Sequence, residues 1–265
     1  MNGWGVFSTL RVSDGVLFAY DRHYRRISSD AERMRVPFDL SSADLEKALL
    51  SLVDANRARN ATLRVAVVRN RGGLFEGAKI TRDADLIAFT ADLVEWGAGV
   101  KLSYMPHSRH AESPFAGRKM TSWAQNLTLY EEAHERGFDE FVLLNEAGQV
   151  SECTSANIFA VFDDQVFTPP IETSGCLPGV TRAILLDEIR IPGLTVSERE
   201  LSPSDLEAAD QVFITSTTRD LLPVLEIDQS ALRQDRAALD QLRRAFHEYR
   251  SSSIANHMRS EIFAA

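Results

Sequence analysis

Lysine side chains are scarce in this sequence, which narrows the search for a reactive amine. The chain has lysines only at positions 47, 79, 101 and 119. Lys47 falls in an amphipathic helical pattern, Lys79 in a glycine-rich loop, and Lys101 at the start of a strand-like stretch. Lys119 stands between a turn of small residues and a helical pattern, which suits a shielded amine acting as nucleophile or base. An ordinary solvated lysine is the alternative interpretation.

A carboxylate with unusual neighbours follows 33 residues later (152 − 119). Glu152 lies among small residues, just before the apolar strand pattern Asn157-Ile158-Phe159. Small neighbours leave room for a flat ligand, and a carboxylate buried there needs a cationic or hydrogen-bonding partner. A protonated ring nitrogen would be such a partner. The alternative is a surface glutamate in a turn.

Three further segments have the residue types that bind an anion. Gly179-Val180-Thr181 precedes a helical pattern, and the first N–H groups and the dipole of a helix favour a negative ligand. Ser216-Thr217 follows an apolar strand pattern, where small hydroxyls can bind phosphate oxygens. Arg26, in His23-Tyr24-Arg25-Arg26-Ile27, offers a two-pronged guanidinium. Plain turns and a solvated basic helix face are the alternatives.

The elements that must position these residues come in mixed order. We predict helices over 21–34 with Asp21 as cap, from Ser41 or Ser42 to 59, and over 122–136, 181–189 and 235–249. We predict strands over 6–12, 62–68, 86–90, 141–144, 157–162, 166–167 and 212–215. Because strands and helices do not alternate strictly, the predicted fold class is α+β. A hinge at 94–99 divides a small domain, 1–95, from a larger one, 96–265.

Composition narrows the function classes. The net charge of -9 and pI near 5.2 argue against a nucleic-acid partner, which requires a basic face. No apolar run reaches the roughly 18 residues of a membrane span, and the first residues lack a signal-peptide pattern. Two cysteines, Cys153 and Cys176, are too few for a disulfide framework. We therefore expect a cytoplasmic protein with a small-molecule substrate and no metal, membrane or nucleic-acid partner.

Read in order, Arg26, Lys119, Glu152, Thr181 and Ser216-Thr217 resemble the class-IV aminotransferases over about 5–227. That family includes D-amino-acid aminotransferases, branched-chain aminotransferases and aminodeoxychorismate lyases. The stretch His23-x-x-Arg26-Ile27 matches the family's phosphate-arginine motif, and Glu152-x-x-x-x-Asn157-Ile158-Phe159 matches its glutamate motif. Its two phosphate turns correspond to Gly179-Val180-Thr181-Arg182 and Thr215-Ser216-Thr217-Thr218.

The resemblance implies a fold type IV protein with a small α/β domain and a larger, mixed, barrel-like domain. It implies pyridoxal 5'-phosphate (PLP) held as a Schiff base on Lys119, with Glu152 at the ring nitrogen. It also implies an amino donor, a keto-acid acceptor, and a homodimer in which a loop of one subunit completes the other's site. The implied phosphate ligands are Arg26, the amides of Val180 and Thr181, Ser216 and Thr217.

The substrate residues depart from the family's patterns. Residues 72–76 read Gly-Gly-Leu-Phe-Glu where lyases often carry Gly-Gly-Arg-Gly-Tyr, and the Pro-Arg-x-His segment of D-amino-acid aminotransferases is missing. We therefore predict that a substrate carboxylate meets Arg109 or, second, Arg71. Thr9, in Phe7-Ser8-Thr9-Leu10-Arg11-Val12, resembles the lyase pattern Phe-Thr-Thr-x-Arg-Val. An aminotransferase is the first prediction. A lyase and a PLP-binding protein without turnover are the alternatives.

Overall fold

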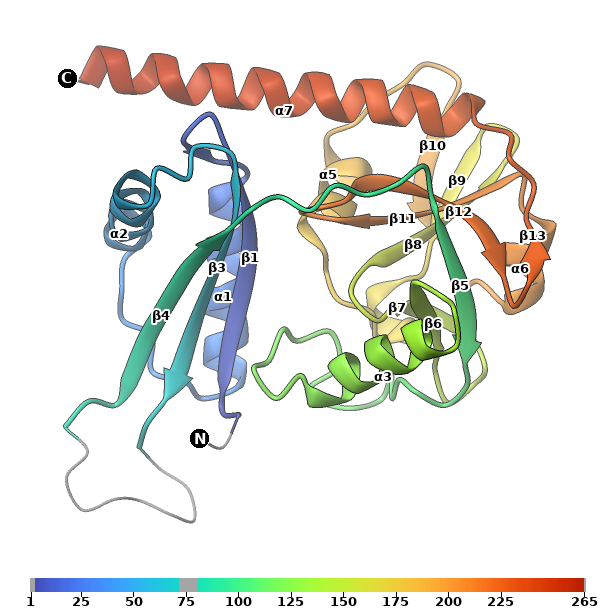
Figure 1. Ribbon diagram of the computed structural model, residues 1–265, viewed down its shortest axis with the longest axis horizontal. Coiled ribbons are helices and arrows are strands. Elements are labelled where there is room, and N and C mark those ends of the chain that lie inside the picture. Colours follow the sequence, from blue (N-terminus) through green and yellow to red (C-terminus); the bar gives the residue numbers. More distant parts are fainter. Residues whose placement is uncertain (1–2, 72–80, 265) are drawn as a thin grey trace. The chain divides into compact units, whose positions relative to one another are not determined.

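The computed structural model describes residues 3–71 and 81–264, with side chains described as far as 259 (Figure 1). By their contacts these residues form two compact units. The first comprises Met1–Val94, Arg118–Trp123 and Arg250–Ala265, and the second Glu95–Gly117 and Ala124–Tyr249. The short segment with Lys119 thus belongs to the first unit, while the chain on both sides of it belongs to the second. The domain limits 1–95 and 96–265 stay a prediction.

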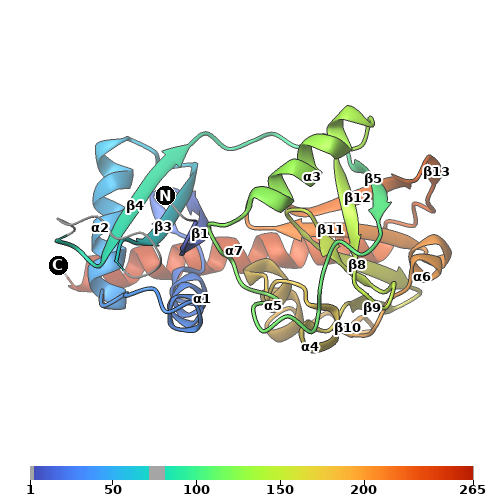
Figure 2. The same ribbon diagram turned by 90° about the horizontal axis from the view of Figure 1, so that it is seen from below.

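The first unit is an antiparallel sheet with helices on one face (Figures 1 and 2). The strand order is β2-β1-β3-β4. Alternation along the strands turns Val6 and Leu10 of β1 toward the helices, where they pack with Ile27, Leu45 and Leu49. The elements are β1 (Gly5–Ser13), β2 (Val16–Leu17), α1 (Tyr20–Arg33), α2 (Ser42–Ala55), β3 (Ala61–Arg69) and β4 (Ala84–Ala91).

Of the two helix caps predicted in this unit, one is confirmed and one is wrong. Ser41 caps α2, as predicted, because its side chain accepts the N–H of Asp44 at 3.1 Å. The predicted cap at Asp21 is wrong. The cap position of α1 is Ala19, which has a left-handed φ of 55°, and Asp21 lies in the first turn. Helix α1 begins earlier because Tyr20 is buried and its hydroxyl donates to the Ser42 carbonyl at 2.6 Å.

The second unit is a mixed sheet of strand order β10-β9-β8-β11-β12-β5-β6-β7, with β13 paired to β12. Parallel pairs join β5 to β6 and β12, and β9 to β10. The mixed helix and strand content confirms the predicted α+β class. The strands are β5 (Val100–Met105), β6 (Glu140–Leu144), β7 (Val150–Cys153), β8 (Asn157–Phe162), β9 (Gln165–Thr168), β10 (Thr195–Glu198), β11 (Gln211–Ser216), β12 (Asp220–Ile227) and β13 (Ser230–Ala231).

The helices of the second unit do not all have the predicted ends. They are α3 (Ala124–Glu135), α4 (Ile171–Ser174), α5 (Val180–Asp187), α6 (Pro203–Ala208) and α7 (Ala237–Ala264). Helix α3 starts at Ala124, after the predicted residue 122, because the preceding segment pairs with β1 through a bridge between Val6 and Met120. Helix α7 continues past the predicted end at 249, where Ile254 is still buried. Within the described ranges, no helix has the length and hydrophobicity that crossing a membrane requires.

A buried ion pair fixes the turn between β11 and β12. Arg219, the last residue of that turn, contacts the Glu140 carboxylate at 2.5 Å, and both side chains are nearly inaccessible. The same carboxylate accepts the hydroxyl of Thr154 at 2.8 Å and the N–H of Ser155 at 2.8 Å. The guanidinium also covers the Trp96 ring at 4.0 Å. Because Thr154 and Ser155 follow β7, one carboxylate joins the turn after β7, the strand with Glu152, to the turn after β11, where Ser216 and Thr217 lie.

Candidate active site

Lys119 is held in the first unit by a buried aspartate. Asp30 of α1 has 0% exposure, and its two oxygens accept the Lys119 N–H at 3.1 Å and the Arg118 guanidinium at 3.2 Å. On the other side, the N–H of Phe7 donates to the Lys119 carbonyl at 2.9 Å. The chain enters this segment at Gly117, whose φ is 69° and where a Cβ would lie 2.9 Å from the Cys176 carbonyl. The backbone of Lys119 is therefore clamped between α1 and β1.

The amine of Lys119 lies against two aromatic rings. Its Nζ is 4.6 Å from the ring centroid of Phe7 and 5.4 Å from that of Trp123. A second cation, Arg64 of β3, lies against the same rings, with Cζ 4.4 Å from Phe7 and 5.6 Å from Trp123. Burial lowers the pKa of Arg64 from its ordinary value, although a guanidinium remains charged. Within the described part of the chain, Arg64 has no carboxylate partner.

Arg26 is supported from behind by a hydrogen-bonded chain. Its Nη2 donates to the Ser8 hydroxyl at 3.0 Å, and that hydroxyl is 2.9 Å from Nδ1 of His23. Because a guanidinium only donates, the Ser8 proton is free to point at Nδ1, which assigns the His23 proton to Nε2. Burial, together with the charges of Arg26 and Lys119, holds the pKa of His23 well below its usual value. His23 is therefore neutral.

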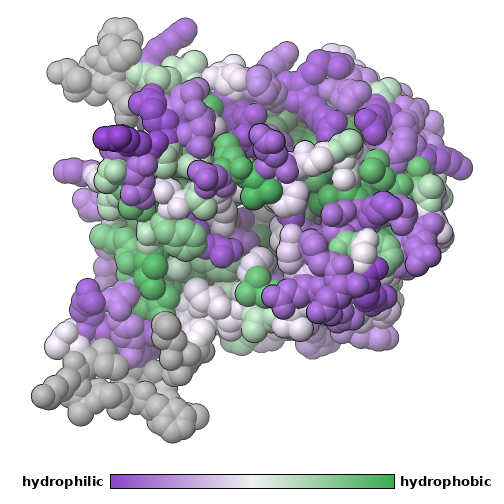
Figure 3. Space-filling view, viewed as in Figure 1, coloured by the Kyte–Doolittle hydropathy of each residue, from purple (hydrophilic) through white to green (hydrophobic). Residues whose placement is uncertain are grey.

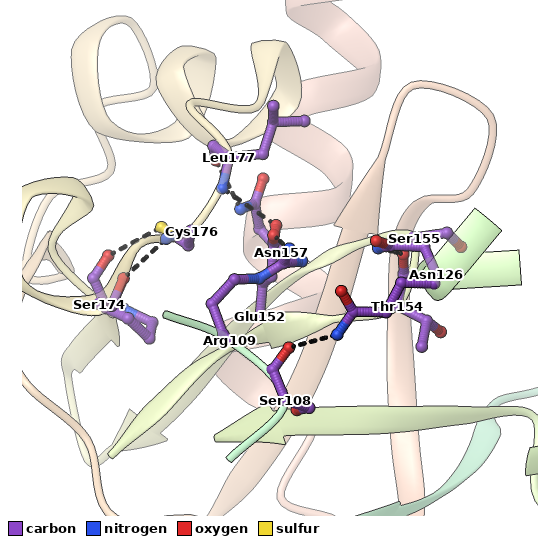
Figure 4. A network of polar contacts seen from close by, with 12 residues as sticks. Ser108, Arg109, Asn126, Glu152, Thr154, Ser155, Asn157, Ser174, Cys176 and Leu177 are labelled. Atoms are coloured by element: carbon purple, nitrogen blue, oxygen red, sulfur yellow. Dashed lines mark hydrogen bonds and ion pairs between the residues drawn. The ribbon is translucent and has the colours of Figure 1, made fainter. Parts of the chain in front are cut away.

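Glu152, on β7 of the second unit, is 7% exposed and accepts two hydrogen bonds (Figure 4). The Arg109 guanidinium donates to Oε1 at 2.6 Å, and the N–H of Leu177 donates to Oε2 at 3.1 Å. Asn157 donates from its side chain to the Leu177 carbonyl at 2.9 Å. Residues of the glutamate motif therefore bind both the N–H and the carbonyl of Leu177. Leu177 lies two residues before Gly179, the N-cap of α5.

The two predicted anion-binding turns lie in the second unit. Helix α5 begins after Gly179. The N–H groups of Val180 and Thr181 are in its first turn, where no intrahelical acceptor exists, and no side chain caps this helix start. A Cβ at Gly179 would lie 2.0 Å from the Asn157 oxygen, which requires glycine there. At the end of β11, the Ser216 hydroxyl accepts the N–H of Arg219 at 3.2 Å. Ser216 and its neighbour Thr217 are half-buried.

The candidate substrate residues lie in different surroundings. Arg109 contacts Glu152, as described. Arg71 is exposed and pairs with Asp83 at 3.2 Å. Thr9 of β1 lies directly across from Arg64 of β3, on the sheet face opposite the helices. The sequence 72–76, which departs from the lyase pattern, lies outside the described residues.

Sequence reasoning missed three residues of this arrangement, Asp30, Arg64 and Arg219. A weak signal existed for Arg64, since it is a charged residue within the strand pattern 62–68, between the apolar Leu63 and Val65. Its proximity to Lys119 depends on which strands pair, so the pattern alone did not indicate it. Asp30 and Arg219 have ordinary sequence surroundings, and only their burial distinguishes them.

Comparison with known proteins gives consistent matches. Residues 5–227 match the family described as amino-transferase class IV. The D-alanine aminotransferase of Bacillus licheniformis is 30% identical over 230 residues, which cover 85% of this chain and 80% of that protein. The branched-chain-amino-acid aminotransferase of Escherichia coli K12 is 29% identical over 238 residues, covering 85% and 77%. A solved putative 4-amino-4-deoxychorismate lyase from Legionella pneumophila shares the fold, with a TM-score of 0.86, 24% identity and coverage of 93% and 91%.

Replacing the clamp carboxylate tests how the lysine segment is held. We predict that Asp30→Asn lowers the free energy of unfolding by about 1.5–3 kcal/mol, because charged hydrogen bonds to Lys119 and Arg118 are lost. Urea denaturation measures this loss. The control is Glu32→Gln, an exposed carboxylate on the same helix, with an expected change within about 0.5 kcal/mol. Equal stability of the two variants would show that Asp30 does not hold the segment.

Proposed function

Because the chain belongs to the class-IV aminotransferase family, we propose that it is a PLP-dependent enzyme moving an amino group between an amino acid or amine and a 2-keto acid. Lys119 is the residue proposed to hold the cofactor as a Schiff base. One observation carries the proposal: the family match includes a lysine that a buried aspartate fixes in the same unit as Arg26.

The polar groups of the candidate residues fit the groups of this cofactor. A phosphate ester requires N–H and O–H donors, and the uncapped start of α5 and the turn after β11 have them. A protonated ring nitrogen requires a poorly solvated carboxylate, and Glu152 is one. We propose that the cofactor is held by Arg26, Lys119, Glu152, Val180, Thr181, Ser216 and Thr217.

In this proposal each side chain has a defined task. Bound PLP supplies a ring that accepts the electron pair released at the substrate's α carbon. Nζ of Lys119 takes up the α proton as a general base and returns it as a general acid. Glu152 accepts the hydrogen bond from the ring nitrogen and keeps a proton there. Phe7 and Trp123 cover the Lys119 amine and limit its contact with water.

We propose Arg64 as the anchor for a substrate carboxylate, in place of Arg109 or Arg71. Arg64 lies on the same aromatic pair as the Lys119 amine and has no carboxylate partner among the described residues. Its partial burial strengthens a two-pronged bond to a carboxylate. Amino acids, as named for the aminotransferase relatives, are therefore the proposed donors, and donor identity and enantiomer are left open.

A lyase that releases pyruvate and 4-aminobenzoate from aminodeoxychorismate is the second candidate. The observation in its favour is Thr9, which shares a sheet face with Phe7 and Arg64. A hydroxyl on that face is on the same side as the Lys119 amine. Pyruvate release from aminodeoxychorismate distinguishes this activity from amino transfer. A PLP-binding protein without turnover would do neither.

We also propose that the protein acts as a cytoplasmic homodimer. Edge strand β4 carries exposed Leu86, Ile87 and Phe89, and Figure 3 shows hydrophobic surface over this part of the first unit. Exposed apolar side chains on an edge strand favour association with another subunit. Cys153 and Cys176 are both buried free thiols, which is compatible with a reducing compartment.

Amino transfer predicts two separable half-reactions. An amino acid should bleach the visible absorbance of the PLP-loaded protein, and a 2-keto acid alone should restore it. Lys119→Ala should slow both changes by about a hundredfold or more, because it removes the general base. Lys101→Ala, at an exposed lysine paired with Glu226, should leave both rates unchanged. A wild-type protein whose absorbance never recovers with any keto acid would contradict the aminotransferase.

The carboxylate anchor is tested by pairing a variant with two substrates. Arg64→Met should lower kcat/KM for an amino acid by about 10- to 150-fold, corresponding to about 1.5–3 kcal/mol for a charged hydrogen bond. The loss should disappear with an amine that has no carboxylate. Arg25→Met, at an exposed arginine of α1, is the control and should have no effect on either substrate. Equal losses with both substrates would argue that Arg64 does not bind the carboxylate.

A further inference from the structure

Arg109, the arginine paired with Glu152, lies on a segment whose backbone is held by hydrogen bonds. Arg109 follows β5, and the N–H groups of Ser108 and Arg109 both donate to the carbonyl of Leu144, the last residue of β6. Counting side-chain atoms alone, Arg109 is 23% exposed and its partner Glu152 is 10% exposed. Figure 4 shows the guanidinium directed at the carboxylate. This arginine therefore forms a largely shielded ion pair, unlike Arg71, which is exposed and pairs with the exposed Asp83.

The carboxylate of Glu152 retains capacity for further donors. An ionised carboxylate has about four acceptor positions, and Arg109 and Leu177 each occupy one. Asn157 fixes the Leu177 carbonyl, so the peptide chain that meets Glu152 is held in place. Arg109 and the Leu177 N–H together fix the orientation of the Glu152 carboxylate. Its remaining lone pairs are available to a donor on a ligand.

Arg109 is poorly suited to binding a substrate carboxylate. If its guanidinium turned away from Glu152 to bind a substrate, the glutamate would keep one amide as partner for a nearly buried negative charge. Breaking such a pair by removing one partner is strongly destabilising. Arg64 has no carboxylate partner among the described residues, so we assign the two arginines separate roles.

We propose that Arg109 is a positioning residue that acts through Glu152 and keeps the proton on the ring nitrogen of the cofactor. The inference rests on the proposed function. If the shared proton moved onto Glu152, the carboxylate would become neutral and Arg109 would lose its counter-charge. A guanidinium cannot release a proton to compensate. The ion pair therefore disfavours proton transfer to Glu152 and holds the ring in its electron-accepting form.

The direct test observes the ring nitrogen in PLP labelled there with 15N and bound to the protein. At neutral pH, the wild type should give the NMR signal of a protonated pyridine nitrogen. Arg109→Gln should move that signal toward the neutral form, and Arg109→Lys, which retains the charge, should restore it. His110→Gln, a neighbouring exposed residue paired with Glu146, is the matched control and should leave it unchanged.

Kinetics give a second, independent readout. Arg109→Gln should slow the half-reaction with an amino acid by about 10- to 100-fold, the scale for removing the outer partner of a functional ligand. In a Glu152→Gln background the same substitution should add no further loss. A cofactor analogue with carbon in place of the ring nitrogen should react equally in wild type and Arg109→Gln.

The outcomes separate this inference from the proposed function. A wild-type protein that does not bind PLP would contradict the function itself. An Arg109→Gln protein that binds PLP with an unchanged ring-nitrogen signal would contradict only the role of Arg109. If Arg109→Gln does not fold, Arg109→Lys decides, because a folded lysine variant with a neutral ring nitrogen would also overturn the inference.

Discussion

The carboxylate of Asp30 is the constraint on which the position of Lys119 depends. It is completely buried, so it requires donors, and the described donors come from Arg118 and the backbone of Lys119. The burial of Asp30 of α1 therefore depends on the segment 118–123 packing in the first unit. The N–H of Phe7 secures the other side of Lys119, and the aromatic rings of Phe7 and Trp123 then define where its amine lies.

Charge is distributed differently in the two units. In the first, Arg26 and Lys119 lie near His23, which burial keeps neutral, and Arg64 lies against the same aromatic rings as Lys119, so the local charge is positive in a chain of net charge -9. Local cationic groups attract anionic ligands regardless of net charge. In the second, Glu140 and Glu152 are each paired with an arginine. A positive local charge in the first unit is consistent with the anionic cofactor and substrate groups of the proposed function.

The sequence predicted the family and the α+β class because several motifs occur in a fixed order, and both predictions are confirmed. Its choice of Arg109, then Arg71, for the substrate carboxylate stays a prediction, and we propose Arg64 instead. Arg109, Arg71 and Arg64 are alike in sequence, and their difference arises from tertiary partners, which are Glu152, Asp83 and an aromatic pair. The wrong cap at Asp21 has a similar origin, since the burial of Tyr20 outweighed the local preference for an aspartate cap. The sequence indicates which residue types could bind the ligand groups. Which residues contact one another depends on the tertiary structure.

The measurement that tests the central claim most directly is reductive trapping of the cofactor. Borohydride treatment of the PLP-loaded protein, followed by peptide mapping, should place the phosphopyridoxyl label on the peptide with Lys119 and on no other lysine. The sequence offers Lys47, Lys79 and Lys101 as internal controls. A label on any of these three in place of Lys119, or no label at all, would contradict the assignment of Lys119 as the residue that binds the cofactor.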